Sequence, residues 1–199
     1  MPIIEPISIE ELDHGVLDSA QFFKGPLGMV PNSLRTMAHR PAIAQAFTAL
    51  NRAVMTCEGR VTPQQKRLIG FVASLAQGCR YCQAHTALGA LRLGASEERL
   101  KALWSYQDSD LFSPAEKAAF NFAMAAASVP NAVSVDIADD LRRHWADGEI
   151  VEILAVISLF GFLNRWNDSM GTTLESSGVH LGETLLASFG WQVDKHGGP

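Results

Sequence analysis

Cysteine is scarce in this chain, which has three cysteines among 199 residues. Three cysteines cannot build the disulfide framework that stabilises many small secreted domains. Positive charge is also limited, because the chain has 16 Lys and Arg residues against 21 Asp and Glu residues, which gives a formal net charge of −5. No Lys/Arg cluster occurs along the chain. The sequence therefore argues against a basic nucleic-acid-binding surface, and we expect no nucleic-acid partner.

Long apolar runs are missing as well. Residues 1–6 contain no basic residue and no extended apolar stretch, so we expect no signal peptide. The most apolar stretch, residues 150–163, is too short to span a bilayer and contains Glu152. These absences predict a cytoplasmic protein without a membrane partner. Hydrophobic residues make up 47% of the chain and charged residues 19%, which is typical of a folded globular protein long enough for one core.

Helix signals recur along the chain. Thr62 and Pro63 combine an N-cap residue with a proline at the first helical position, and apolar residues follow at spacings of three and four until Gly78, a typical helix stop. Ser113 and Glu116 form a capping box. No pair of strands is evident, so the sequence predicts an all-α fold. The predicted helices cover residues 8–24, 32–39, 41–57, 62–77, 79–94, 114–128, 134–145, 148–168 and 181–189, with another starting after Ser96 and irregular segments at 25–31 and 191–199.

Residues 150–163 are apolar on nearly all sides of the helix that they are predicted to form. Glu152 is the one ionisable side chain in this stretch, and we therefore expect it to be partly buried. A helix of this kind lies at the centre of a core or at a subunit interface.

The clearest chemical feature is a Cys-x-x-Cys pair, Cys79 and Cys82, followed by His85. Gly78 is expected to end the preceding helix, which places both cysteines in the first turn of the next one. Unpaired N–H groups and the helix dipole at that position favour a thiolate, and position alone makes Cys79 the more exposed thiol. His85 lies one turn beyond Cys82 and can accept or donate a proton. A second thiol nearby converts a sulfenic acid to a disulfide before further oxidation.

Other uses of cysteine fit the pattern less well. A structural zinc site needs four ligands, and no second Cys or His pair follows at ligand spacing, because His180 and His196 are isolated. We therefore expect no metal and no cofactor. The βαβ unit in which a thioredoxin-like Cys-x-x-Cys lies is absent. Cys57 has no partner nearby in the sequence and is expected to be a small buried hydrophobic residue.

Residues 78–86, with the helix predicted over 62–77, resemble the AhpD-like alkylhydroperoxidase and carboxymuconolactone decarboxylase family. The resemblance is strongest over about residues 40–105, and residues 150–167 also resemble peroxidase-related members. It implies an all-α fold and assembly into trimers or hexamers. The domain organisation expected from it is a single AhpD-like domain over 1–199, with a core at about 40–170, N-terminal helices at 8–39 and a C-terminal tail at 190–199.

The resemblance also implies roles for the motif residues. In the peroxidase branch the second cysteine attacks the hydroperoxide and the first forms the disulfide, so Cys82 would be peroxidatic, Cys79 resolving and His85 the proton carrier. The substrate would be a small hydroperoxide and the reductant an external thiol. The family places three residues between the second cysteine and the histidine, where this chain has two. It also has a glutamate twelve residues before the first cysteine, where this chain has Arg67, which cannot accept a proton.

Three further residues are candidates for completing the site. Glu152 could replace the missing carboxylate as a proton relay, because burial raises the pKa of a carboxyl group. Tyr81 could supply a hydroxyl or serve in packing, and Arg67 could stabilise a thiolate. Two other functions remain open on the same scaffold. One is a non-catalytic thiol redox sensor or oligomeric binding protein, and the other is a carboxymuconolactone decarboxylase-like enzyme, which does not need a cysteine pair.

Overall fold

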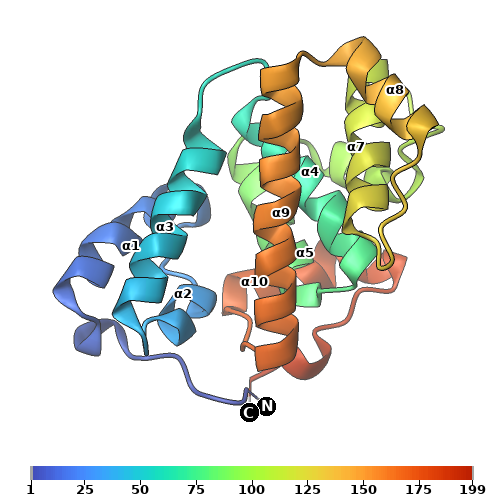
Figure 1. Ribbon diagram of the computed structural model, residues 1–199. Coiled ribbons are helices and arrows are strands. Elements are labelled where there is room, and N and C mark those ends of the chain that lie inside the picture. Colours follow the sequence, from blue (N-terminus) through green and yellow to red (C-terminus); the bar gives the residue numbers. More distant parts are fainter. Residues whose placement is uncertain (1, 199) are drawn as a thin grey trace.

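The computed structural model describes residues 2–198, and within them the chain forms helices and no strand (Figure 1). The predicted all-α fold is confirmed. The α-helices are α1 (His14–Leu27), α2 (Asn32–Met37), α3 (Pro41–Thr56), α4 (Pro63–Gln77), α5 (Arg80–Arg92), α6 (Glu97–Lys101), α7 (Pro114–Ala127), α8 (Val135–His144), α9 (Asp147–Met170) and α10 (Ser176–Leu181). Short 3-10 or π turns lie at η1 (Ile9–Glu11), η2 (Ala102–Ser105), η3 (Gly182–Leu186), η4 (Ala187–Phe189) and η5 (Asp194–His196).

Helix α9 runs along the middle of the molecule, with α1 to α3 on one side and α7 and α8 on the other (Figure 1). Helix α4 packs against α5, α7 and α9 and so connects the thiol-bearing helix to the core. The approach of α4 to α9 is close at Gly70. A Cβ at that position would lie 2.4 Å from the ring of Phe160, so the contact requires a glycine.

The helix boundaries that position the motif follow from local capping. The Thr62 side chain accepts a hydrogen bond from the Gln65 amide, and the Ser113 side chain accepts one from the Glu116 amide. Gly78 adopts a left-handed conformation with φ of 74° and ends α4. Because α5 follows directly, the two cysteines lie at its start, as the sequence predicted.

Three predicted boundaries differ from the structure. Helix α1 continues through Pro26 to Leu27, where an irregular segment was expected, because its left-handed stop is Gly28 and Leu27 is buried. The last predicted helix, 181–189, is the second part of a longer helical segment that begins with α10 at Ser176. Helix α9 extends two residues beyond its expected end, to Met170.

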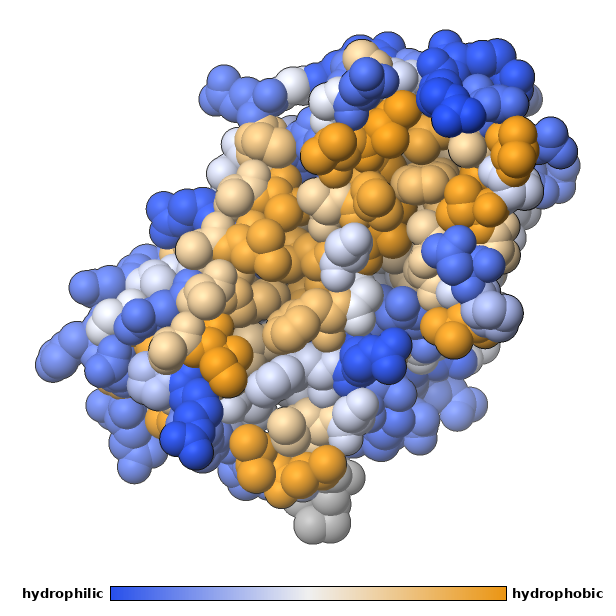
Figure 2. All heavy atoms as spheres, viewed as in Figure 1, coloured by the Kyte–Doolittle hydropathy of each residue, from blue (hydrophilic) through white to orange (hydrophobic). Residues whose placement is uncertain are grey.

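The outer sides of α3 and α9 form one apolar surface. Figure 2 shows a broad hydrophobic region across this face of the molecule. We call it the apolar face and define it by its exposed large residues, which are Ile43, Leu50, Val151, Leu154 and Phe162. A hollow of about 400 Å³ lies within it, lined by Ala42, Ile43, Ala46, Phe47, Leu50 and Phe162. The opposite side of α9 is buried, so this helix contributes to both the core and the surface.

Among residues 2–198, no helix is both long enough and apolar enough to cross a lipid bilayer.

Candidate functional site

The two motif cysteines lie together at the start of α5. Cys79 is the N-cap residue and Cys82 is in the first turn, and the Cys82 thiol donates a hydrogen bond to the Cys79 sulfur. The expectation that Cys79 is the more exposed thiol is wrong, because it is fully buried and Cys82 is 2% exposed. The C-terminal segment covers the start of α5, and the Trp191 indole donates to the Arg80 carbonyl at 3.1 Å. The predicted irregular tail is therefore part of the site.

The pKa values of the two thiols are shifted in opposite directions. The pKa of Cys79 is lowered to about 6, mainly because the Cys82 thiol donates to its sulfur; burial opposes this, and His196 adds a hydrogen bond. The pKa of Cys82 is raised well above its ordinary value, mainly by burial and then by the interaction with Cys79. One proton is thus held on Cys82, and Cys79 carries the negative charge at neutral pH.

His196, which the sequence presented as an isolated residue, faces Cys79. Its Nδ1 lies 2.8 Å from the carbonyl oxygen of Thr172. A carbonyl accepts hydrogen bonds and cannot donate them, so Nδ1 carries a hydrogen. That Nε2 lies 3.8 Å from the Oδ1 atom of Asp168. Cys79, Asp168 and His196 each offer one ligand atom within 4.8 Å of the others, so this cluster is where the described residues could hold a metal ion.

Cys82 opens onto a small cavity of about 30 Å³. The predicted residues Tyr81, Arg67 and His85 line the same cavity, so the structure brings four of the six candidate residues to its wall. The remaining wall is mostly apolar and is formed by Phe23, Leu27, Pro31, Ser33, Phe47, Asn51, Phe160, Leu163 and Asn167. The Asn167 side chain donates to the Cys82 sulfur at 3.5 Å. A space of this volume admits about one or two water molecules, or the reactive end of a larger molecule.

Glu175 is the carboxylate beside the histidine. Its Oε2 lies 2.6 Å from His85 Nε2, and its Oε1 accepts from the Tyr81 hydroxyl at 3.1 Å. The backbone amide of Asn32 also donates to Oε1, at 2.5 Å. Burial tends to raise the pKa of Glu175, but His85 and the Asn32 amide outweigh it and the net pKa is lowered. Glu175 is therefore ionised at neutral pH and fixes the position of the imidazole.

Tyr81 packs against His85 and donates to the same carboxylate. The two rings stack with centroids 4.4 Å apart and planes 15° apart. The Tyr81 oxygen also accepts from the Ser33 amide at 3.2 Å. Burial, followed by the charge of Glu175, raises the pKa of Tyr81 well above its ordinary value, so it stays protonated. Tyr81 thus has both roles considered from the sequence, packing and hydrogen bonding.

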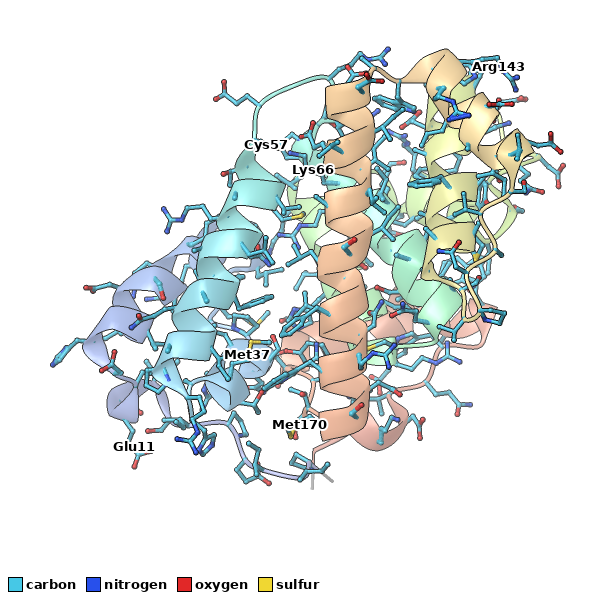
Figure 3. The ribbon with its side chains drawn as sticks, viewed as in Figure 1. Glu11, Met37, Cys57, Lys66, Arg143 and Met170 are labelled. Carbon is cyan, nitrogen blue, oxygen red and sulfur yellow. The ribbon has the colours of Figure 1, made fainter. Side chains whose placement is uncertain are left out.

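Glu152 does not belong to this site, which corrects the expectation of a relay. It is partly buried, as expected, but its Oε1 lies 2.5 Å from Lys66 Nζ and accepts from the Cys57 thiol at 2.8 Å. Figure 3 shows Cys57 and Lys66 near the start of α9, whereas Met170 marks the other end. Cys57 is exposed, so its assignment as a buried hydrophobic residue is also wrong. No motif spacing in the sequence pointed to Glu175 in place of Glu152.

Arg67 is buried at the cavity wall without a counter-charge. Arg67 is 6% exposed, and its Nε has no hydrogen-bond partner among the described residues. No ion pair formed within residues 2–198 includes it. Burial lowers the pKa of Arg67 to about 10, so the guanidinium remains charged at neutral pH. Gly89 makes room for it, since a Cβ there would lie 2.9 Å from Nε.

The sequence model of the carboxymuconolactone decarboxylase family matches residues 41–125, which is less than half of the chain. Over these residues the chain is similar to that family, and its all-helical fold is shared with a solved structure described as an alkylhydroperoxidase AhpD core.

Solved structures are similar to this chain over most of its length. A complex of a Cys-to-Ala variant of the debrominase Bmp8 with 2,3,4-tribromopyrrole has a TM-score of 0.86 and 27% identity, and it covers 94% of this chain and 97% of the debrominase. An uncharacterized peroxidase-related protein from Ralstonia eutropha JMP134, described as an alkylhydroperoxidase AhpD core, has a TM-score of 0.75 at 24% identity, covering 88% and 94%. That second likeness shows a shared fold.

Sequence relatives cover less of the chain. The uncharacterized protein YdfG of Bacillus subtilis (strain 168) is 26% identical over 123 residues, which are 61% of this chain and 83% of YdfG. The uncharacterized protein YnjA of Escherichia coli (strain K12) is 28% identical over 92 residues, 46% of this chain and 50% of YnjA.

Proposed function

We propose that this protein is a dithiol oxidoreductase that reduces small hydroperoxides through Cys79 and Cys82. The observation that carries the proposal is the placement of the two thiols together at the start of α5, beside a cavity that Cys82 and His85 line. One sulfur is already a thiolate, and the other faces the space that a substrate would enter. The pair His85 and Glu175 provides a fixed proton carrier next to the reacting sulfur.

The first step is attack on the peroxide. The proton of Cys82 moves along the hydrogen bond to Cys79, and the Cys82 thiolate attacks the terminal oxygen of the hydroperoxide. An S–O bond forms and the O–O bond breaks, which reduces the peroxide and oxidises Cys82 to a sulfenic acid. The alkoxide leaves and takes a proton from His85. The ionised Glu175 lies 2.6 Å from His85 Nε2 and holds the imidazole in position for this transfer.

The second step closes the disulfide. Cys79 gives its proton to Nε2 of His196 and attacks the Cys82 sulfur, so that an S–S bond forms and the S–O bond breaks. The departing hydroxide takes that proton from His196 and leaves as water. The balance is one hydroperoxide and one dithiol giving an alcohol, water and a disulfide. An external thiol then restores the dithiol by thiol–disulfide exchange. The apolar face makes a homo-oligomer the proposed assembly.

The test is consumption of cumene hydroperoxide with dithiothreitol as reductant. Wild type should turn over, Cys82→Ser should fall to the rate without enzyme, and Cys79→Ser should form a trappable sulfenic acid on Cys82 without fast turnover. Equal rates for wild type and Cys82→Ser would rule out the proposal. A Cys79–Cys82 disulfide that forms without turnover would instead support the thiol-sensor alternative.

Reductive dehalogenation is the second candidate, and the likeness to debrominase Bmp8 over nearly the whole chain favours it. Here the Cys82 thiolate would attack bromine, forming an S–Br bond as the C–Br bond breaks, and the carbon would take a proton. Cys79 would then attack the Cys82 sulfur and release bromide, giving the same disulfide. Bromide release from 2,3,4-tribromopyrrole with dithiothreitol, abolished in Cys82→Ser and seen without hydroperoxide consumption, would make this the preferred function.

A further inference from the structure

Arg67 is a buried cation whose counter-charge the described residues do not supply. Removing a charge from water is costly unless it is paired, and buried charged groups are normally paired or hydrogen-bonded. Its Nε has no partner, although the cavity beside it also contains the buried Oδ1 of Asn51, itself without a partner. A structural cation would be expected to have its carboxylate or carbonyl in place. An unpaired guanidinium at a cavity wall is what an anion-binding site presents before its ligand arrives.

Arg67 also lines a second, larger space. This pocket has a volume of about 410 Å³ and lies among the ends of α1, α3 and α5 and the start of α4. Its wall is mainly apolar, with Phe22, Pro26, Met55 and Leu93. Arg92 adds a second cation, and the exposed Glu58 is the acidic side chain at its edge. Arg67 is thus the charged residue shared by this pocket and the cavity of Cys82.

We infer that Arg67 recognises an anionic group on the substrate, and that the substrate is a small, largely apolar organic acid. The reactive end would enter the small cavity at Cys82, the apolar body would occupy the larger pocket, and the anionic group would bind the guanidinium between them. A carboxylate fits the fork of N–H donors with two parallel hydrogen bonds. The inference rests on the proposed thiol chemistry for the reacting end, and it adds the class of molecule that is bound.

The main competing role for Arg67 is stabilisation of a thiolate. The contacts do not favour it, because the side chain that donates to the Cys82 sulfur is Asn167 and the groups that lower the pKa of Cys79 are Cys82 and His196. A thiolate role would also not explain why Arg67 lines the larger pocket. The two roles differ in what they predict, since only anion recognition makes binding depend on the charge of the ligand.

The binding test uses octanoate and octanamide, which differ in charge but hardly in shape. Isothermal titration on the reduced full-length protein should show octanoate binding at least about tenfold more tightly than octanamide, which corresponds to one good charge-assisted hydrogen-bonded pair. Arg67→Met should abolish this preference. Arg143→Met is the matched control, since Arg143 lies on the exposed side of α8, far from α5, and should leave the preference unchanged (Figure 3). Equal binding of the two ligands to wild type, or no binding of either, would overturn the inference.

The turnover test uses cumene hydroperoxide with a carboxylate on its ring, and the methyl ester of the same compound, with dithiothreitol. Wild type should have the lower KM for the acid, and Arg67→Met should reduce the ratio of the ester KM to the acid KM about tenfold or more. A protein that prefers octanoate but consumes neither hydroperoxide would keep the anion site and refute the peroxidase proposal. A protein that consumes acid and ester equally and binds octanoate no better than octanamide would refute the anion site and keep the peroxidase proposal.

Discussion

Glu175 Oε2 lies 2.6 Å from His85 Nε2, although the two residues are 90 positions apart in the sequence. An ionised carboxylate only accepts hydrogen bonds, so Nε2 carries a hydrogen and Nδ1 is the nitrogen left to exchange a proton with the substrate. The same carboxylate binds the Tyr81 hydroxyl and the Asn32 amide, and it therefore joins α2, α5 and the start of α10. One residue thus sets both the orientation of the proton carrier and the packing around it.

We expect Glu175→Gln to lower hydroperoxide turnover about tenfold or more, because the imidazole loses the carboxylate that holds it in position. The unfolding free energy should fall by about 1–3 kcal/mol, the usual contribution of hydrogen bonds to a charged group. The pKa of Glu175 is lowered in the folded state, so this stabilisation is present at neutral pH and is lost as pH falls through the lowered pKa. Urea unfolding of both proteins at pH 7 and at about pH 3 should show the difference shrinking in acid.

Glu97→Gln is the control for this substitution. Glu97 pairs with Lys101 on the surface, and exposed pairs of this spacing contribute about 0.3–0.5 kcal/mol. Its turnover and stability should stay close to those of wild type. Wild-type turnover in Glu175→Gln would mean that His85 does not depend on this carboxylate.

Local sequence rules predicted the parts of the site that local hydrogen bonds determine. The Thr62 cap, the Gly78 stop and the thiol pair at the start of α5 follow from residues within a few positions of one another. Glu175 and His196 could not be found in this way. They follow α9 in the sequence and come next to α5 only when the chain is folded. Their contacts depend on the packing of distant segments, which no spacing within the sequence records.

The misplacement of Glu152 has the same origin. Its partial burial was predicted correctly from its apolar neighbours, but burial does not say which group a carboxylate faces. The structure pairs Glu152 with Lys66 and Cys57, and no pattern in the sequence links either residue to it. Arg67, in contrast, was singled out through the family resemblance, and the structure places it at the cavity because α4 and α5 pack directly.

We expect His196→Gln to raise the pKa of Cys79, because the imidazole beside its sulfur is one of the groups that lower that pKa. Other ionisable groups around Cys79 are Cys82 and Asp168, and both remain in the variant. Alkylation by iodoacetamide at a series of pH values reports the thiolate, and trypsin cleavage after Arg80 separates the two cysteines into different peptides. Cys79 in wild type should be half-reactive near pH 6, as its lowered pKa indicates, with a higher midpoint in His196→Gln.

His180→Gln supplies the same substitution on an exposed histidine of α10 and should leave the Cys79 profile unchanged. An unaltered midpoint in His196→Gln would show that Cys82 alone sets the acidity of Cys79. Zinc content is measured on the same samples, because metal bound by Cys79, Asp168 and His196 would block alkylation at all pH values and would be detected directly.

We expect Arg67→Met to be more stable than wild type at neutral pH. The folded-state pKa of Arg67 is lowered to about 10, so below that pH the fold carries the full cost of burying the charge. Replacing an unpaired buried cation by an apolar side chain of similar length should raise the unfolding free energy by about 1–3 kcal/mol, or Tm by about 2–10 °C. Thermal denaturation checks this, with Arg143→Met expected to melt as wild type does. A lower Tm for Arg67→Met would indicate a structural role for the guanidinium.

The apolar face should be an interface between copies of this chain. Leu154 and Phe162 on α9 and Leu50 on α3 are each more than 40% exposed, and an apolar hollow lies between the two helices. A second copy offers the same surface, and apolar contacts need no complementary charge, so self-association would cover it. Sedimentation velocity should show wild type as an oligomer, a trimer or hexamer if the family resemblance holds.

Leu154→Glu should shift the protein to monomers with unchanged helix content, because a charge in the contact must be buried without a partner. Val129→Glu is the matched control, since Val129 is 83% exposed in the turn after α7 and lies outside the apolar face. It should sediment as wild type does. A monomeric wild type, or an unchanged mass for Leu154→Glu, would contradict the assignment. Loss of the oligomer in both variants would place the contact elsewhere, because the control changes the same charge at a site that the apolar face does not include.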